Sequence, residues 1–167
     1  MSLGLMWTAA LPQAFNENSD RRLSMDARDL VVQLSLRRVS LEQAEDAVSA
    51  YSKNAEAADE EVMLSIFAAV FDTLADTRRD VINGIEHYSL KQIALSERIE
   101  SARTEMRALA ASDNPDFDRI DALEEQLDWD ERVFRDRARS LSYVCETPVL
   151  IEKRLYSVAQ LLLKYAR

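Results

Sequence analysis

The chain has 167 residues, of which 47% are hydrophobic, and a formal net charge of −9 at pH 7. This length suits a single domain with a substantial core, and two glycines and three prolines are too few for the many turns of a β-sandwich or a Rossmann-type fold. The acidic balance disfavours a nucleic-acid binder and adsorption to an anionic membrane, because both need a basic surface.

The chain begins with an apolar, uncharged stretch, residues 1–15, followed by a polar stretch, residues 16–22. One interpretation is the remnant of a signal peptide, although a basic start is missing and Pro12 interrupts it. The alternative is an apolar arm that packs on the helical domain or on a partner. We therefore separate an N-terminal arm, residues 1–23, from a single helical domain, residues 24–167. The protein would be cytoplasmic, or periplasmic or exported if the arm is such a remnant.

The first predicted helix begins after Ser24, a residue type that caps helix N-termini. Ser40 followed by Gln43 has the spacing of a capping box, so a break or kink near residues 38–40 is an alternative to one continuous helix. The less hydrophobic residues 52–58 predict the turn into the next helix. The apolar stripe of the first helix begins with Leu30, Leu34 and Leu41.

Residues 58–111 contain apolar positions that recur at alternating steps of three and four, with some steps skipped. This spacing approaches the seam of a coiled coil, and an unbroken helix of this length would span roughly 80 Å. Two seam positions are polar, Arg78 and Gln92, and such residues can fix register and oligomeric state. A break near Gly84 would instead give a compact bundle. The apolar seam consists of Leu64, Phe67, Phe71, Leu74, Val81, Ile85, Tyr88, Leu95, Ile99, Ala102, Met106 and Leu109.

The clearest boundary in the chain is the turn cluster at residues 112–116, where Pro115 cannot continue the preceding helix. A further helix follows, with acids near its start and arginines later, the order that the helix macrodipole favours. Thr147 and Pro148 suit the start of a new helix through about residue 165, and one helix kinked at Pro148 is the alternative. The short turn makes antiparallel neighbours of the helices that it joins.

The sequence thus predicts an all-α protein. One architecture is a long antiparallel, coiled-coil-like helical hairpin with an additional N-terminal helix. The other is a compact up-down bundle of four or five helices. We expect no transmembrane segment, because no stretch is long and apolar enough to span a bilayer.

No pattern in the sequence points to catalysis, to a metal or to a cofactor. A single histidine, His87, and a single cysteine, Cys145, exclude an internal disulfide, a CxxC motif and the paired Glu-x-x-His of a dimetal bundle. We interpret Cys145 as a small core residue and His87 as an ordinary helix residue. We expect that the protein is not an enzyme, with no catalytic residue, no metal ligand and no cofactor.

Two features favour binding to a protein. Trp129 lies two residues past the inward Leu127 and is flanked by acids, so it is either packed on a third helix or a partly exposed anchor for a partner. The last predicted helix is apolar on more than one side and needs cover from the arm or from a second chain. The candidate partner-binding residues are Trp129, Asp128, Asp130, Asp116 and Phe117.

The leading hypothesis is a non-enzymatic helical interaction module, an adaptor, scaffold or regulator that acts through its hairpin face or its acidic tip. Its partner would be another protein or a second copy of the chain, and a homodimer is one form of this hypothesis. A narrower form is an acidic inhibitor or immunity protein for a basic enzyme. The alternative is a helical-bundle sensor or carrier that holds a small ligand in its core.

Overall fold

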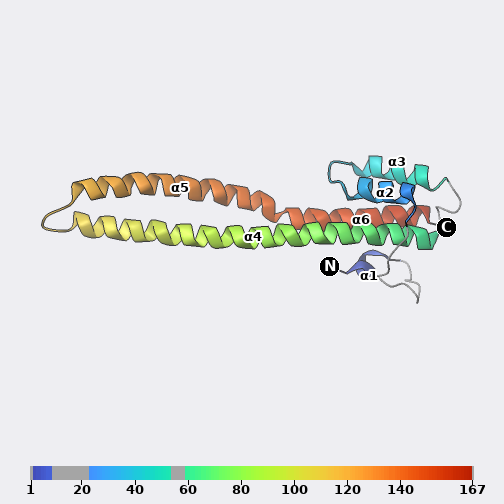
Figure 1. The fold of residues 1–167 in the computed structure, drawn as a ribbon, viewed down its shortest axis with the longest axis horizontal. Coiled ribbons are helices and arrows are strands. Elements are labelled where there is room, and N and C mark those ends of the chain that lie inside the picture. The colour runs from blue at the N-terminus through green and yellow to red at the C-terminus, as the bar shows by residue number, and fades with distance from the viewer. Residues whose placement is uncertain (1, 9–22, 54–58, 167) are drawn as a thin grey trace. The chain divides into compact units, whose positions relative to one another are not determined.

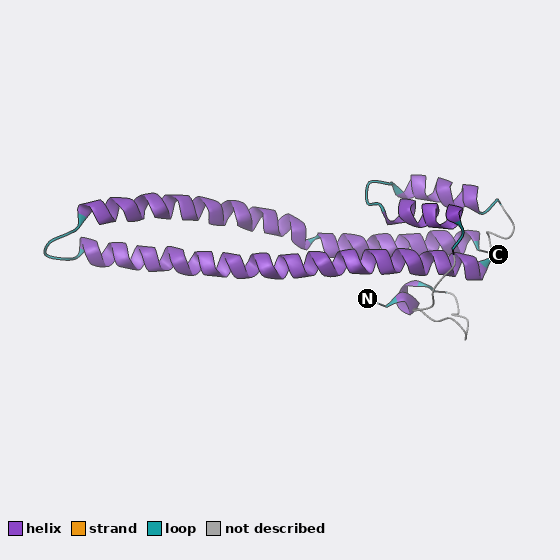
Figure 2. Ribbon diagram, viewed as in Figure 1, coloured by secondary structure: helices purple, strands orange, loops and turns teal. Residues whose placement is uncertain are grey.

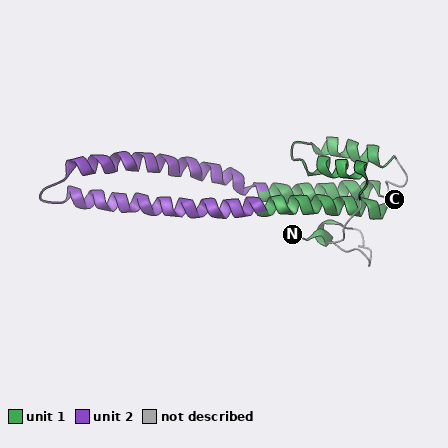
Figure 3. Cartoon of the chain, viewed as in Figure 1, with its two compact units in different colours: residues 1–79, 148–167 green, residues 80–147 purple. Residues whose placement is uncertain are grey.

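The computed structural model describes residues 2–8, 23–53 and 59–166. Every regular element in these residues is an α-helix (Figure 2), so the predicted all-α class is confirmed. The chain divides into two compact units (Figure 3): unit 1 comprises residues 1–79 and 148–167, and unit 2 comprises residues 80–147. The helices are α1 Leu3–Met6, α2 Met25–Ser35, α3 Leu41–Tyr51, α4 Glu60–Ala110, α5 Phe117–Cys145 and α6 Thr147–Tyr165.

The first predicted helix is in fact two helices, α2 and α3, and both begin with the expected caps. The Ser24 hydroxyl accepts a hydrogen bond from the Ala27 amide at 3.2 Å. At α3, Ser40 and Gln43 form the predicted capping box, with bonds of 3.1 and 3.0 Å. The break changes the helical phase, so Leu41, expected inward, is 47% exposed.

Helix α4 passes through Gly84 without a break, and its bounds differ from the predicted range by one or two residues. Gly84 is helical and exposed, and none of the described glycines has a positive φ. The alternative in which the long helix breaks near Gly84 is therefore wrong for this chain.

Unit 1 has a core made by four helices and the N-terminal segment. Trp7, which is 1% exposed, stacks on Phe67 of α4 with ring centroids 5.4 Å apart. This burial is what the packed-arm alternative predicts for residues 2–8, whereas residues 9–22 lie outside the described part of the chain. The largest fully buried side chains of this core are Trp7, Phe67, Leu3, Leu34, Met63, Leu64, Ile66, Ile151, Leu155, Leu162 and Val48.

Helices α2 and α3 pack on the apolar α6. The chain itself therefore provides part of the packing that was predicted to come from the N-terminal arm or from a second chain. The Arg154 guanidinium of α6 donates to the carbonyl oxygens of Leu34 and Val39, each at 2.8 Å. These are groups at the end of α2 and in the loop after it, where no intrahelical donor is available. Burial lowers the pKa of Arg154, but the two carbonyls compensate part of that cost. Leu161 and Leu163 pack against the same core.

Unit 2 is an antiparallel helical hairpin made by residues 80–110 of α4 and by α5 (Figure 1). The helices are joined by the predicted turn, and Asp116 caps α5 by accepting a hydrogen bond from the Arg119 amide at 3.1 Å. Helix α5 ends at Cys145 and α6 begins at Thr147, so the segment forms two helices and not one kinked helix. The buried core of unit 2 consists of Leu95, Ile99, Ala102, Leu123 and Leu127.

Candidate protein-binding site

The seam of the hairpin contains a buried carboxylate. Asp130 follows Leu127 by three residues and precedes Phe134 by four, which places it on the α4-facing side of α5. It is 3% exposed, and Arg98 of α4 donates from Nε to its Oδ2 at 2.8 Å and from Nη2 to its Oδ1. This bidentate bond raises the pKa of Arg98 above its usual value. Asp130 is therefore buried in the seam of the hairpin and bound by Arg98, so it does not present an exposed carboxylate; contact with a partner stays a prediction.

The two polar seam residues of α4 also have partners within their own unit. Gln92 is 8% exposed, and its Nε2 donates to the backbone oxygen of Phe134 at 3.1 Å, whereas its Oε1 is buried without a partner. In unit 1, Arg78 forms an ion pair with Glu152 of α6 at 2.8 Å. Both residues thus constrain how their helices pair, because a shifted register would break these bonds.

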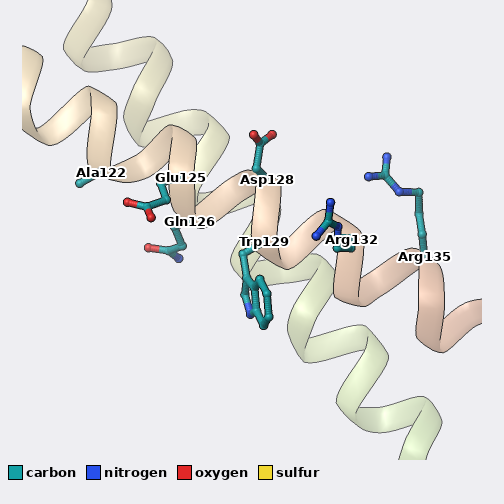
Figure 4. A pocket seen from close by; sticks show the side chains of 7 residues that line it. All are labelled: Ala122, Glu125, Gln126, Asp128, Trp129, Arg132 and Arg135. Carbon is teal, nitrogen blue, oxygen red and sulfur yellow. The ribbon is translucent and has the colours of Figure 1, made fainter.

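Trp129 is exposed and is not packed on a third helix. It is 64% exposed, and Figure 4 shows its indole leaving α5 on a different side from Asp128. Its neighbours form a groove between α4 and α5 with a volume of about 410 Å³, here called the Trp129 groove. The groove is lined by Lys91, Ala94, Leu95, Arg98, Trp129, Asp130, Val133 and Arg137.

The Trp129 groove is locally basic in an acidic protein. Three cationic side chains, Lys91, Arg98 and Arg137, surround one carboxylate, which Arg98 already neutralises. The Arg137 guanidinium lies 6.0 Å from the centre of the Tyr88 ring, within the range of a cation–π contact. Lys91 has no ion pair or hydrogen bond to any described residue. A ligand in the groove would therefore meet an apolar floor and free positive charge.

A second hollow, of about 750 Å³, lies on the outer surface of α5. All of its lining residues belong to this one helix (Figure 4), so it is an open depression between side chains and does not enclose a ligand. Its lining residues are Ala122, Glu125, Gln126, Asp128, Trp129, Arg132 and Arg135.

Of the remaining predicted site residues, Asp128 shares the outer hollow of α5 with Trp129, whereas Phe117 and Asp116 line neither described hollow that contains Trp129. Asp128 is exposed and lines the outer hollow. Phe117 is 69% exposed, but it lies twelve residues before Trp129 on α5, which is roughly 18 Å along the helix. Asp116 is the N-cap of α5, and that capping role accounts for an acid at this position.

Neither His87 nor Cys145 belongs to a site in the described residues. Cys145 is exposed, so its interpretation as a core residue is wrong: it is the last residue of α5, beyond the buried core of unit 2. His87 is exposed on α4. In the part of the chain that the structure describes, no three histidine, cysteine or acidic side chains cluster as metal ligands would. Nor does any described helix have the length and hydrophobicity that a membrane crossing requires.

Sequence reasoning missed the basic wall of the Trp129 groove. Lys91 and Arg98 lie seven residues apart on α4, a spacing that shares one helix face, but their meeting with Trp129 depends on the register across the hairpin. No protein-family model matches the sequence, and comparisons with curated proteins and with solved structures gave no match either. The function is therefore inferred from the residues of the site.

Proposed function

We propose that this protein is a non-enzymatic interaction module that binds another protein through the Trp129 groove. The observation that carries this proposal is a tryptophan with 64% exposure beside a groove with an apolar floor and basic side chains around it. Tryptophan is among the residues that contribute most to protein–protein binding energy, and exposing one costs free energy that a partner can recover.

The charges of the groove indicate the chemistry of the partner. Among the described residues Lys91 has no ion pair or hydrogen bond and Arg137 contacts only the Tyr88 ring, so both can donate to a carboxylate of a partner. Val133 and Leu95 supply the apolar floor. We expect a partner segment that presents an apolar side chain next to one or more aspartates or glutamates. Such complementary charge raises the association rate and excludes basic competitors.

Site-specific photo-crosslinking in the cell of origin tests the proposal. A photoreactive amino acid at Val133, inside the groove, is expected to crosslink a discrete partner protein. The same group at Tyr156, which is exposed on α6 of unit 1, is the matched control and should not give that product. Mass spectrometry of the crosslinked peptide then reveals whether it is acidic and apolar, as expected.

Two substitutions locate the binding energy. Trp129→Ala and Lys91→Glu are expected to reduce the crosslink by roughly tenfold, because they remove the anchor and reverse the free charge. Tyr156→Ala removes an exposed aromatic residue elsewhere and should leave it unchanged. If Trp129→Ala captures the same partner at the same yield as the wild type, the groove is not the binding site.

The alternative function, a carrier with a small ligand in its core, has no specific observation in its favour. The core of unit 1 is filled where α1 meets α4, since Trp7 stacks on Phe67 there. Gln92 Oε1 in unit 2 is a buried acceptor without a partner, but a single acceptor does not define a ligand.

A further inference from the structure

The side of α5 that faces away from α4 carries a stripe of exposed residues with a regular charge pattern. The steps between its members are four, four, three, four, three, four and four residues. An α-helix turns by about 100° per residue, so all members of the stripe lie within a sector of about 80° around the axis of α5. This sector is on the side opposite the buried Leu123 and Leu127. The stripe, here called the α5 stripe, consists of Phe117, Asp121, Glu125, Asp128, Arg132, Arg135, Arg139 and Tyr143, all exposed.

The α5 stripe is self-complementary about position 130. Its three acids precede this position and its three arginines follow it at the same distances, so that Asp128 corresponds to Arg132. In the same way Glu125 corresponds to Arg135, Asp121 to Arg139, and Phe117 to Tyr143. Two antiparallel copies of such a helix, related by a two-fold axis beside position 130, bring each acid to the height of an arginine of the other copy. Asp121 and Arg139 are aligned around the helix axis, Asp128 and Arg132 are offset by about 40°, and Glu125 and Arg135 by about 80°. The same arrangement brings Phe117 of each copy to the height of Tyr143 of the other, with an offset of about 80° around the helix axis.

We propose that the α5 stripe is a dimer interface whose partner is the same stripe of a second, antiparallel copy of this chain. The α5 stripe shares no residue with the Trp129 groove, although Trp129 also lines the depression beside the stripe. The inference goes beyond the proposed function, and the readouts of the two proposals differ, so each can fail separately. Each pairing of a two-fold interface occurs twice, so the pattern brings six pairs of opposite charges and two pairs of aromatic residues to matching heights.

The charges of the stripe have no side-chain partner in the described part of the chain. None of its six charged residues forms an ion pair or a hydrogen bond with a side chain among the described residues, although Asp128 and Arg132 are four residues apart on one face. Several charges of α5 on the sides nearer α4 are paired instead. Glu131 binds Arg103 at 2.6 Å and Arg119 binds Glu105 at 2.7 Å. The charges of the stripe thus have no side-chain partner among the described residues, although Arg135 also lines a hollow with Ser96 and Ile99 of α4.

The helix macrodipole does not account for this arrangement. It favours acids in the first turn and bases in the last turn, and its effect fades within that distance. Arg132 and Arg135 lie ten or more residues before the end of α5 at Cys145. Glu124 and Asp136, which are also equidistant from position 130, lie about 120° apart around the helix axis, farther apart than any pair of the stripe, whose widest pairs lie about 80° apart.

The ends of the stripe provide apolar contacts to accompany the charges. Phe117 is 69% and Tyr143 is 78% exposed, and aromatic residues of this kind are enriched in protein interfaces. The depression on the outer surface of α5 is lined by Glu125, Asp128, Arg132 and Arg135, which are symmetric about position 130. A second helix can therefore approach closely at the centre of the stripe.

A charge-swap experiment on the full-length purified protein tests this interface. The all-acidic variant is Arg132→Glu/Arg135→Glu/Arg139→Glu, and the all-basic variant is Asp121→Arg/Glu125→Arg/Asp128→Arg. Alone, each variant would place only like charges opposite one another, and we expect the dimer dissociation constant to rise at least about tenfold. The equimolar mixture restores opposite charges at all six pairs, so we expect a heterodimer with an affinity near that of the wild type. Sedimentation equilibrium measures the dimer dissociation constants of the two variants and of their mixture. The matched control is Arg28→Glu/Arg37→Glu/Arg38→Glu, which changes exposed arginines of unit 1. This control should dimerise like the wild type.

Every outcome of this experiment decides the proposal. A wild type that is monomeric at 100 μM, roughly the concentration that detects weak dimers, overturns it. The proposal is also overturned if the two variants dimerise as tightly as the wild type. It is overturned too if the mixture stays monomeric while circular dichroism shows that both variants are folded. Recovery in the mixture supports it, and a variant that had failed to fold could not recover.

A crosslinking measurement tests the antiparallel register independently. In a Cys145→Ser background, Asp128→Cys protein mixed with Arg132→Cys protein is expected to form an intermolecular disulfide. Asp128→Cys mixed with Arg139→Cys should not, because that pair is out of register by seven residues, roughly 10 Å along the helix. If Asp128→Cys instead crosslinks fastest with itself, the helices are not arranged around position 130 as proposed. The groove proposal is unaffected by either result, since its readout is a different protein crosslinked at Val133.

Discussion

Replacing Arg98 with alanine should destabilise unit 2 far more than removing the carboxylate that Arg98 binds. Asp130 is 3% exposed, and its carboxylate accepts two side-chain hydrogen bonds, both from Arg98. Removing one partner of a buried pair leaves an uncompensated charge, which costs about 3–5 kcal/mol when the pair is fully enclosed. Arg98 is itself 59% exposed, so water enters the space it leaves, and we expect a smaller loss of about 2–3 kcal/mol.

The opposite substitution, Asp130→Leu, should be neutral or stabilising by about 1 kcal/mol. It places an apolar residue on the seam between Leu127 and Phe134, and burying a leucine there contributes up to about 1.5–3 kcal/mol before any packing mismatch. The released Arg98 guanidinium remains largely in water and loses little. The double variant Arg98→Ala/Asp130→Leu should then resemble Asp130→Leu alone, which gives a coupling energy of about 2 kcal/mol in the cycle.

Native-state hydrogen exchange read by mass spectrometry is the appropriate assay, because peptides from residues 80–147 report on unit 2 separately from unit 1. Faster exchange in Arg98→Ala and wild-type exchange in the double variant are the expected results. If the two single substitutions destabilise these peptides equally and their effects add, the carboxylate is not held by Arg98 and the reasoning about the seam fails.

Three further substitutions test the packing of the two units. Gly84→Ala should raise the free energy of unfolding by about 0.5–1 kcal/mol, since Gly84 lies in the helix interior and an added Cβ meets no atom within 4 Å; a loss of stability in urea denaturation would show that the helix is distorted there. Trp7→Ala should cost about 3–5 kcal/mol in unit 1, whereas Trp7→Phe should cost much less because it removes a buried indole N–H that has no partner. Equal costs in urea denaturation would contradict the burial of Trp7. The hydrogen bond from Lys164 and the charge of Lys164 lower the pKa of Glu45. The stability that this ion pair contributes is therefore present above the ordinary carboxyl pKa of 4.5. It is lost as the pH falls through the lowered pKa of Glu45 in the folded protein. In thermal melts between about pH 6 and about pH 3, Glu45→Gln should therefore differ from the wild type least at the acid end.

Local sequence signals predicted most of the helix boundaries. The bounds of α4 follow from the repeat of apolar residues, and the break between α2 and α3 follows from the capping box at Ser40 and Gln43, because both are interactions between residues close in the chain. The turn before α5 was equally clear from Pro115. In these places the local preference and the final structure agree.

The candidate site was harder to predict because it depends on contacts between helices. Asp130 occupies a seam position by its spacing, yet an aspartate surrounded by other acids resembles a surface residue until the register brings Arg98 to it. The Trp129 groove needs the same register, since its basic wall comes from α4. Cys145 was misassigned because apolar spacing continues to the end of α5, while the buried core of unit 2 ends earlier.

The order in which the two units can form follows from the way the chain divides. Unit 2 is one uninterrupted stretch, and its bond between Arg98 and Asp130 joins residues 32 positions apart. Unit 1 is assembled from both ends of the chain, and the bond from Arg154 to Leu34 joins residues 120 positions apart. Contacts close in sequence form sooner than distant ones, and the ribosome releases the hairpin before α6. Unit 2 should therefore fold during synthesis. The apolar residues of the first segment of unit 1 stay unpacked until α6 has been synthesised, and until then they are candidates for chaperone binding.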